Sequence, residues 1–592
     1  MRNKQIKLNN CSIFGLSYNK NMKRAGLVLF LNILIIGVML PVFGAYYGNI
    51  PQTTLQIARN AMNSSYNANS KLVRVGIGNQ NFSSYVRENA SIYGTGEFEI
   101  YNKNTYMTTL DSNNQVNISM VGKIFVLTDI DGNVINKVSG PIIFKTDFGF
   151  LGIKDLKRGG KDAVYRGRLE LICAGEGKFY VVNSLDVEDY LKGVVPNEMP
   201  VHFGLEALKA QAVAARNYVL SPRVKANPNY DVVDSVASQV YYGANTEKDL
   251  SNQAVDETMG IVATYNWDLI LALYSSTAGG YTESYENAFS DPKTKVFPAD
   301  SKPYLKAVPD NDNFTPLNTE EEAEKFYTTK PKSFDVNSSY YRWEREWTQE
   351  ELQSEIQNNI AAQSAAGFVH PVVQKGETIG KILRLEVLER GLSGKIMKLQ
   401  IETDNGNYTV EKELVIRRLF TNKGKALPSA NLVFKQKFDE EGNLKSVKAY
   451  GGGYGHGVGM SQFGAGYMAT SLHLPYEKIL QHYYSGISLT TEPFIISSNS
   501  AQNKVTQTFF AKNGEGKLIV DNKYKVRYID ACINNVDEKI ELDTSQRINT
   551  INISKYLQKG INTITFYYPL SSGSNKGLRM YVELTGKYDY SN

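Results

Sequence analysis

The chain has 592 residues, which is too long for one hydrophobic core and predicts two to four domains. Hydrophobic residues make up 42% of the sequence and charged residues 21%, as in ordinary globular proteins. The net charge of +5 is too small to indicate a nucleic-acid-binding protein, although it suits contact with an anionic surface. We therefore expect no nucleic-acid partner.

The N-terminus has the pattern of a membrane anchor. Residues 1–25 are polar and basic, and the apolar segment at 26–47 holds a run of roughly 18 residues with Asn32 as its one polar side chain, which is long enough for a marginal span. Basic residues precede the run and none follows closely, which places the bulk of the chain outside the cytoplasm. The alternative is a signal peptide cut after Gly44, with secretion of the remainder. The long basic leader favours the retained anchor, and residues 48–70 read as a polar linker.

The region after this linker has the alternating pattern of β-strands. Gly and Asn residues separate the alternating runs, which indicates hairpin turns. The predicted strands cover residues 72–77, 96–101, 125–128, 165–171 and 178–185.

The cysteines show no paired spacing that would indicate a disulfide framework or a zinc module. Of the three, Cys11 precedes the apolar run, and Cys173 and Cys532 lie in separate regions. Cys173 falls on a predicted strand, so we expect it to be a buried free thiol.

Glu198 lies between two prolines and ahead of a helix. Pro196 and Pro200 are stiff residues, so we expect a short extended loop that presents the carboxylate into a cleft. Apolar residues at helical spacing predict a helix over 205–219, and alanines on its other face allow close packing. Taken alone, this stretch favours an ordinary acid near a helix start as the interpretation of Glu198.

Further elements follow as far as a loop of small residues, 275–284. Such a loop is either a connector or the lining of a site where a sugar chain approaches the backbone. The elements ahead of it are predicted strands at 230–234, 236–243, 260–265 and 269–274 and a predicted helix at 249–258.

A second lobe is predicted around residues 310–445, with a helix at 348–362 and strands within 382–410. A short helix at 477–484 closes the preceding region near residue 489. The tail, residues 490–592, is rich in predicted strands at 516–520, 524–529 and 560–566. The residue pattern of the tail resembles that of the β-sandwich accessory modules of carbohydrate-active enzymes.

Residues 450–465 contain too many glycines for a plain helix or strand. A nucleotide-binding loop is one alternative, but Val458 stands where G-x-G-x-x-G requires glycine, and no Walker lysine follows. Pro196-Asn197-Glu198-Met199-Pro200 and residues 453–462 (GYGHGVGMSQ) together resemble the stage II sporulation protein D family (SpoIID/LytB-like), whose members include peptidoglycan lytic transglycosylases.

The resemblance runs from about residue 70 to 489 and implies an α+β fold. We expect a β-rich catalytic region with a few helices at 71–489, a membrane segment before it and a β-sandwich module after it. Glu198 matches the family's proposed catalytic acid. Arg216 resembles a family arginine implicated in activity, and a helix C-terminal cation is its alternative role.

The other residues that we expect to bind substrate lie in the stretches that resemble the family's. A core role remains the alternative for His456. The predicted substrate-binding residues are Gln239, Tyr242, Ser275, Ser276, Thr277, Gly279, Gly280, Glu283, Tyr454, His456, Ser461 and Gln462.

The resemblance implies a reaction that needs one protein carboxyl group. The acid protonates the oxygen between muramic acid and glucosamine, and the C6 hydroxyl of the same muramic acid then closes a 1,6-anhydro ring. This chemistry requires a raised carboxyl pKa. No cofactor is expected, and no metal either, because residues 230–239 and 275–280 lack the His and Cys with which some family members hold zinc.

The expected partner is a peptidoglycan glycan strand, and the expected location is the cell membrane with the bulk of the chain outside. Some relatives are described as enhancers of a cell-wall amidase, so a glycan-binding partner of an amidase is the second interpretation. A structural scaffold among sporulation membrane proteins is the third.

Overall fold

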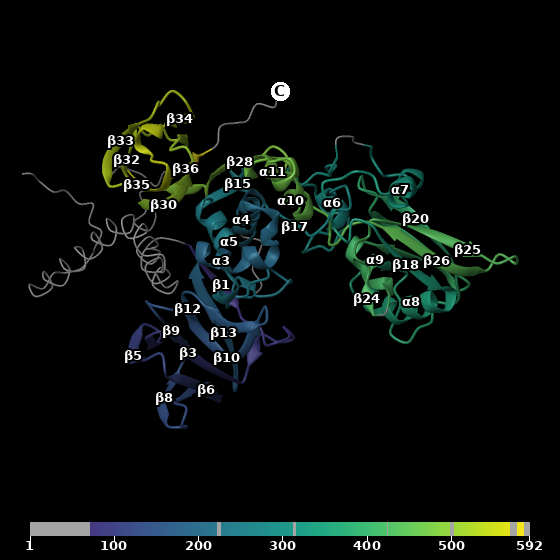
Figure 1. Ribbon diagram of the computed structural model, residues 1–592, viewed down its shortest axis with the longest axis horizontal. Helices are drawn as coiled ribbons and strands as arrows, with labels where there is room; N and C mark the ends of the chain where they lie inside the picture. The colour runs from purple at the N-terminus through teal and green to yellow at the C-terminus, as the bar shows by residue number, and fades with distance from the viewer. Residues whose placement is uncertain are drawn as a thin grey trace, which may run out of the picture.

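The computed structural model describes residues 71–221, 227–311, 315–422, 424–497, 503–568 and 577–584. The chain folds as a mixed, strand-rich α+β protein with few helices (Figure 1). The predicted anchor at 26–47 lies outside the described residues, and no helix within them is long and apolar enough to cross a membrane.

Two antiparallel-rich sheets form the β-rich N-terminal part, and they share one hydrophobic core. The first has the order β14 (Val232–Val233), β1 (Leu72–Gly76), β13 (Lys178–Asp186), β12 (Arg168–Gly175), β9 (Ile142–Lys145), β4 (Phe98–Asn102) and β5 (Thr105–Leu110), with β2 (Val86–Arg87) on β13. The second has the order β11 (Lys161–Tyr165), β10 (Leu151–Arg158), β3 (Asn89–Gly94), β6 (Gln115–Val121), β7 (Ile124–Thr128) and β8 (Val134–Ser139).

Most of the strands predicted in this part are present, because alternation places every second side chain in the core. The predicted burial of Cys173 is wrong, since its side chain is exposed. Leu169 and Leu171 on the same face of β12 are fully buried. Cys173 lies beyond them, where a bulge ends the pairing with β13.

The predicted strand at 236–243 is also wrong, because β14 stops at Val233. The segment bonds elsewhere: the Tyr241 N–H donates to the Asp234 carbonyl, and the Val240 N–H donates to the Glu198 side chain.

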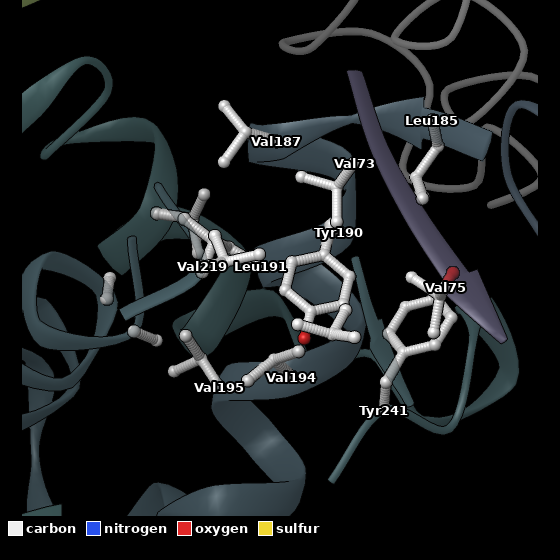
Figure 2. Packing of buried hydrophobic residues seen from close by; sticks show 14 of the residues in the cluster. Val73, Val75, Leu185, Val187, Tyr190, Leu191, Val194, Val195, Val219 and Tyr241 are labelled. Carbon is white, nitrogen blue, oxygen red and sulfur yellow. The ribbon is translucent and has the colours of Figure 1, made fainter. Parts of the chain in front are cut away.

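A helical layer covers these sheets at the centre of Figure 1. It consists of α3 (Val187–Glu198), α4 (Leu205–Leu220), α5 (Asp249–Asp256), α10 (Gln462–Thr470) and α11 (Tyr476–Tyr483). Figure 2 shows Tyr190, Leu191 and Val194 of α3 packed against Val73 and Val75 of β1. The alanines of α4 are fully buried, as the sequence predicts, and α3, α5, α10 and α11 all contact this helix.

The predicted extended loop around Glu198 is wrong. Helix α3 continues through Pro196 and ends at Glu198, and the Met199 N–H closes its last turn on the Val195 carbonyl. Pro196 has no backbone N–H, so the last turn of α3 lacks the hydrogen bond that residue 196 would donate to the Lys192 carbonyl. The short 3-10 helix η2 (Val201–Phe203) and Gly204, at φ +88°, then lead into α4.

A third sheet joins the tail to this central part. Its order is β16 (Asp268–Leu269), β15 (Ile261–Tyr265), β28 (Ser488–Thr491), β36 (Leu578–Glu583), β31 (Lys517–Asp521) and β34 (Ile548–Asn552), with β29 (Phe494–Ile496) on β36. A fourth sheet in the tail has the order β30 (Lys504–Ala511), β35 (Gly560–Tyr567), β32 (Tyr528–Ile533) and β33 (Val536–Glu541). Tail strands of both sheets share a core, and a role as an accessory module stays a prediction.

The lobe at the right of Figure 1 has its own core. One of its sheets has the order β18 (Trp343–Thr348), β26 (Leu444–Gly451) and β25 (Leu432–Phe438). Another has the order β19 (Val369–His370), β22 (Gly406–Glu411), β21 (Ile396–Thr403) and β20 (Ile382–Arg390), and β23 (Thr421–Asn422) pairs with β24 (Lys425–Ala426). Its helices are α7 (Glu320–Tyr327), α8 (Gln349–Ser364) and α9 (Glu413–Leu419). Helix α8 begins one residue after the predicted start, with Thr348 as its N-cap in a capping box with Glu351.

The connection between the lobe and the centre is made by short elements. The parallel pair of β17 (Tyr274–Ser275) and β27 (Met460–Ser461) brings the predicted small-residue loop beside the glycine-rich stretch. The short helix α6 (Tyr285–Ala288) contacts α9 of the lobe, and the 3-10 helix η3 (Ala244–Thr246) packs on β11 and α3 in the centre.

Candidate active site

Glu198 lies at the C-terminal end of α3, where its carboxyl group borders a cavity of about 340 Å³. Phe203 and Phe463 lie on the walls, with their ring centroids 4.9 Å apart. The other lining residues are Pro196, Asn197, Met199, Pro200, Ser276 and Gln462. Among these described lining residues, Glu198 provides the one carboxyl group.

Burial raises the pKa of Glu198 to about 7, against the opposing effect of one backbone hydrogen bond. That bond runs from the Val240 N–H to Oε1, at 2.6 Å. The position of Glu198 adds to the effect of burial, because the C-terminal end of a helix carries partial negative charge and disfavours the carboxylate. The carboxyl group is thus suited to give and take a proton near neutral pH.

Three tyrosines surround Glu198, and sequence reasoning did not single out any of them. Burial raises the phenol pKa of Tyr190, Tyr218 and Tyr274, and the nearby Glu198 charge raises each further. They come from α3, α4 and β17, so no local spacing in the sequence connects them. The Glu198 environment is therefore built from aromatic hydroxyls that stay protonated.

Gln239 holds two of these tyrosines. It accepts a hydrogen bond from the Tyr190 hydroxyl at 3.1 Å and donates one to the Tyr274 hydroxyl at 3.0 Å. Because Gln239 is fully buried, it lies behind the cavity and not on its wall. We therefore describe this predicted substrate-binding residue as a positioning residue.

Gln462 and Ser276 are the predicted binding residues that do line the cavity with Glu198. Gln462 Nε2 donates to the Glu198 backbone carbonyl at 2.9 Å and to Gln211 Oε1 at 3.2 Å. The Ser276 carbonyl accepts the Phe463 N–H, which fixes the aromatic wall. These two stretches, far apart in sequence, thus meet at the end of α3.

The glycines of residues 453–459 lie where two loops pack closely. The approach of a glycan to their backbone, which the sequence led us to expect, stays a prediction. A Cβ on Gly459 would lie 2.1 Å from the Leu273 carbonyl oxygen, and one on Gly453 would lie 2.9 Å from that of Ala278. They therefore allow the two loops to pack backbone against backbone.

Several predicted binding residues belong to this packing. The Thr277 hydroxyl bonds to Ser338 at 2.7 Å, and the Gly279 and Gly280 N–H groups both donate to Asp335. Ser275 pairs with Ser461 across the β17–β27 ladder, and the Ser461 hydroxyl caps α10. None of these five predicted residues (Ser275, Thr277, Gly279, Gly280, Ser461) is among the residues that line the Glu198 cavity.

Glu283, Tyr454 and His456 also lie outside the lining of that cavity. Glu283 is fully buried and accepts hydrogen bonds from the Ser393 hydroxyl and N–H. Tyr454 is exposed and stacks on Tyr340. Burial, together with nearby cations, lowers the pKa of His456 to about 3, and its Nδ1 accepts the Val458 N–H. His456 is a neutral structural histidine, which fits the alternative role that we gave it.

Arg216 and Tyr242 are separated from Glu198. Nε and Nη2 of Arg216 donate to the two oxygens of the Glu188 carboxylate, at 2.8 and 2.5 Å, and Nη1 donates to the Ile261 carbonyl. With 1% exposure and its donors engaged, Arg216 joins α4 to α3 and does not reach the Glu198 cavity. Tyr242 stacks on Phe82 instead.

Within the described residues, no group of three or more His, Cys, Asp and Glu side chains is placed to hold a metal ion. The arrangement at Glu198 is a single carboxyl group with a pKa near neutrality, beside two aromatic rings. Such a site offers general acid–base chemistry, and aromatic faces of the kind that pack on sugar rings.

The chain is similar to proteins of known families. Residues 175–265 match the family model described as Stage II sporulation protein, and residues 291–459 match Domain of unknown function (DUF8618). "Stage II sporulation protein D" of Bacillus subtilis (strain 168) is 29% identical over 325 residues, which cover 52% of this chain and 76% of that protein. An uncharacterized protein of Brachyspira hyodysenteriae is 30% identical over 353 residues, covering 59% and 76%.

"Amidase enhancer" of Bacillus subtilis (strain 168) is 32% identical over 314 residues, which cover 51% of this chain and 40% of that protein. The chain thus spans less than half the length of this relative. Glu198 lies within the part of the chain that matches the Stage II sporulation protein model, and the chain has an α+β fold. The chain belongs to the stage II sporulation protein D family.

Proposed function

We propose that this protein is a peptidoglycan lytic transglycosylase with Glu198 as its acid and base. The observation that carries the proposal is the single Glu198 carboxyl group, with a pKa of about 7, in the aromatic-walled cavity. Two-step or water-activating glycosidases use a pair of carboxyl groups. A single carboxyl group suffices where the substrate supplies the nucleophile.

In the proposed reaction, the protonated Glu198 gives its proton to the glycosidic oxygen between muramic acid and glucosamine. The bond from C1 to that oxygen breaks, and the muramyl C6 hydroxyl attacks C1. The Glu198 carboxylate takes the hydroxyl proton and returns to its starting state. The products are a 1,6-anhydromuramyl end and a free glucosamine end, with the hydroxyl held close enough to replace an external nucleophile.

The site residues have defined roles in this proposal. The Val240 N–H fixes the rotation of the carboxyl group at 2.6 Å, and Gln462 fixes the end of α3 by its bond to the Glu198 carbonyl. Phe203 and Phe463 provide flat apolar surface for a sugar ring. The names of the relatives support a role in sporulation. We further propose that this role is cell-wall remodelling at the outer side of the cell membrane, on the basis of the basic and apolar N-terminal sequence.

The relative named "Amidase enhancer" supports a second candidate function, in which the same cavity binds glycan and the protein stimulates a cell-wall amidase. Amide replacement of Glu198 separates the two. Incubation of the full-length chain with glycan strands free of stem peptides should yield anhydromuramyl ends, by mass spectrometry, for the wild type and for the exposed control Glu440→Gln, and none for Glu198→Gln. Strand binding without new ends in the wild type would favour the amidase partner.

A further inference from the structure

A closed polar cluster lies beneath the glycine-rich loop, where the right-hand lobe meets the centre of the molecule (Figure 1). Lys395 and Asn431 face each other across an antiparallel bridge, just before β21 and β25. Lys395, Ser393 and Glu283 are fully buried, and Asn431 is 1% exposed. The proposed glycosidic chemistry uses none of these groups, so their burial needs a separate explanation.

The Lys395 amine lacks the usual partner of a buried lysine. Within the described part of the chain, no carboxylate lies within ion-pairing distance of Nζ, and the one hydrogen bond of Nζ goes to Asn431 Oδ1, at 2.5 Å. The nearby Glu413 pairs with Arg417, at 3.3 Å. Burial lowers the pKa of Lys395, because a lone ammonium is costly to desolvate. Burial therefore favours the neutral form of the amine, which is the nucleophilic form.

The Asn431 carboxamide is held as the acceptor of such a nucleophile. Its carbonyl oxygen contacts the lysine amine, so the carbonyl carbon bonded to that oxygen is also in reach. Its amide nitrogen donates to Ser393 Oγ at 3.2 Å, and Ser393 Oγ donates to Glu283 Oε2 at 2.6 Å. The Tyr327 hydroxyl borders the same amide. A hydrogen-bonded chain thus connects the potential leaving group to a buried carboxylate.

We propose that Lys395 and Asn431 become joined by an intramolecular isopeptide bond, with the Ser393–Glu283 relay orienting the leaving amide nitrogen. The Nζ lone pair attacks Cγ of Asn431 and forms the new C–N bond. The bond from Cγ to Nδ2 breaks, and its electron pair leaves with Nδ2. The proton that Nζ loses passes to Nδ2 within the tetrahedral intermediate, so one ammonia is released. No oxidant or other reactant is needed.

The burial of the cluster favours this reaction over the competing ones. The amine, the carboxamide and the relay are held by the fold, which raises their effective concentration, and exclusion of water prevents hydrolysis of the asparagine. The product ties the start of β21 to the start of β25, against the Gly457 backbone that lies over the lysine. It would cross-link the junction of the lobe without disulfides, which fits the scarcity of cysteines in the sequence.

The mass of the purified full-length chain tests this proposal directly. The wild type should be lighter than its sequence by one ammonia, and a tryptic digest should contain residues 391–398 joined to residues 426–435, with no cleavage after Lys395. A full sequence mass with cleavage after Lys395 in all or most of the folded protein would overturn the proposal, because it leaves a plain hydrogen bond.

Variants assign the bond to its residues. Lys395→Arg keeps a long basic side chain but removes the nucleophilic amine, so it should restore the full mass. Lys398→Arg, on the partly exposed Lys398 that pairs with Glu411, should leave the linked peptide unchanged. Asn431→Asp distinguishes the acceptor, because a bond formed by that variant releases water in place of ammonia. If Lys395→Arg and Asn431→Asp both still lose the mass of one ammonia and still contain a linked peptide, the link lies elsewhere and the assignment is contradicted.

Discussion

At the scale of single residues, the account depends on the protonation of Glu198. Its position at the end of α3, among Tyr190, Tyr218 and Tyr274, makes the carboxylate unfavourable and the carboxylic acid favourable. The proline motif alone does not reveal this, because the helix end that faces Glu198 is the negative end of α3, whereas the sequence directed attention to the positive end of the following helix.

The raised pKa predicts a pH dependence of stability. The native state holds the Glu198 proton up to about pH 7, whereas the unfolded chain releases it near its ordinary pKa of 4.5. Stability from this group is therefore present at low pH and is lost as the pH rises from 4.5 to 7, by at most about 3 kcal/mol. Urea unfolding of Glu198→Gln against wild type should show a stability difference that favours the variant increasingly over this range. A constant difference would contradict the raised pKa.

Arg216 is predicted to matter for stability and not for substrate contact. Arg216→Ala leaves the Glu188 carboxylate buried and unpaired and should cost about 3–5 kcal/mol. Arg168→Ala is the matched control, because its ion pair with Glu170 is partly exposed and should cost at most about 1 kcal/mol. Denaturant unfolding measures both. Equal small losses of stability in both variants, with binding of glycan strands lost in Arg216→Ala alone, would show that Arg216 contacts substrate.

At the scale of elements, the parallel pair of β17 and β27 is what brings the two signature stretches together. The close packing of these loops needs glycine at Gly459, where φ is +73° and a Cβ would meet the Leu273 carbonyl. Gly457 has a similar φ of +69° but open space, with its nearest contact at 3.7 Å. Substitutions at the two glycines therefore distinguish the cost of a left-handed backbone conformation from the cost of a steric clash.

We expect Gly459→Ala to lose about 2–4 kcal/mol of stability, the sum of a left-handed conformation and overpacking. Gly457→Ala should lose about 1 kcal/mol, from conformation alone. Thermal unfolding of the two variants beside wild type measures the difference. Equal losses would show that the close approach at Gly459 relaxes without cost.

Sequence patterns predict the elements well where one face is buried. The helices at 205–219, 249–258 and 348–362 and the hairpin that ends at Asp186 are present, because periodicity and capping decide them locally. The expected strand at 236–243 is absent because N–H groups of this segment donate to the Glu198 side chain and to a loop carbonyl. The tyrosines around Glu198 could not be predicted for a related reason, since contacts between distant elements leave no regular spacing in the sequence.

At the scale of the whole molecule, separate hydrophobic cores support the centre and the right-hand lobe (Figure 1). Glu198 belongs to the centre, and the glycine-rich loop that leads from the lobe bridges to Thr277, next to the cavity residue Ser276. The cores should therefore unfold in distinct steps, because few hydrophobic residues are shared between them.

Calorimetry of matched core variants tests this division. Val447→Ala in the lobe and Val194→Ala in the centre each remove a fully buried side chain and should cost about 2 kcal/mol. We expect each variant to lower the melting temperature of a different transition. A single transition that both variants lower equally would show that the cores fold as one unit.

The proposed function requires that Glu198 breaks glycan strands and does not only bind them. Mass spectrometry of strands free of stem peptides, after incubation with wild-type protein or with Glu198→Gln at pH 7, tests this requirement. We expect anhydromuramyl ends with the wild type, none with the variant, and undiminished strand binding by both. Anhydromuramyl ends produced equally by Glu198→Gln, or intact strands with both proteins, would contradict it.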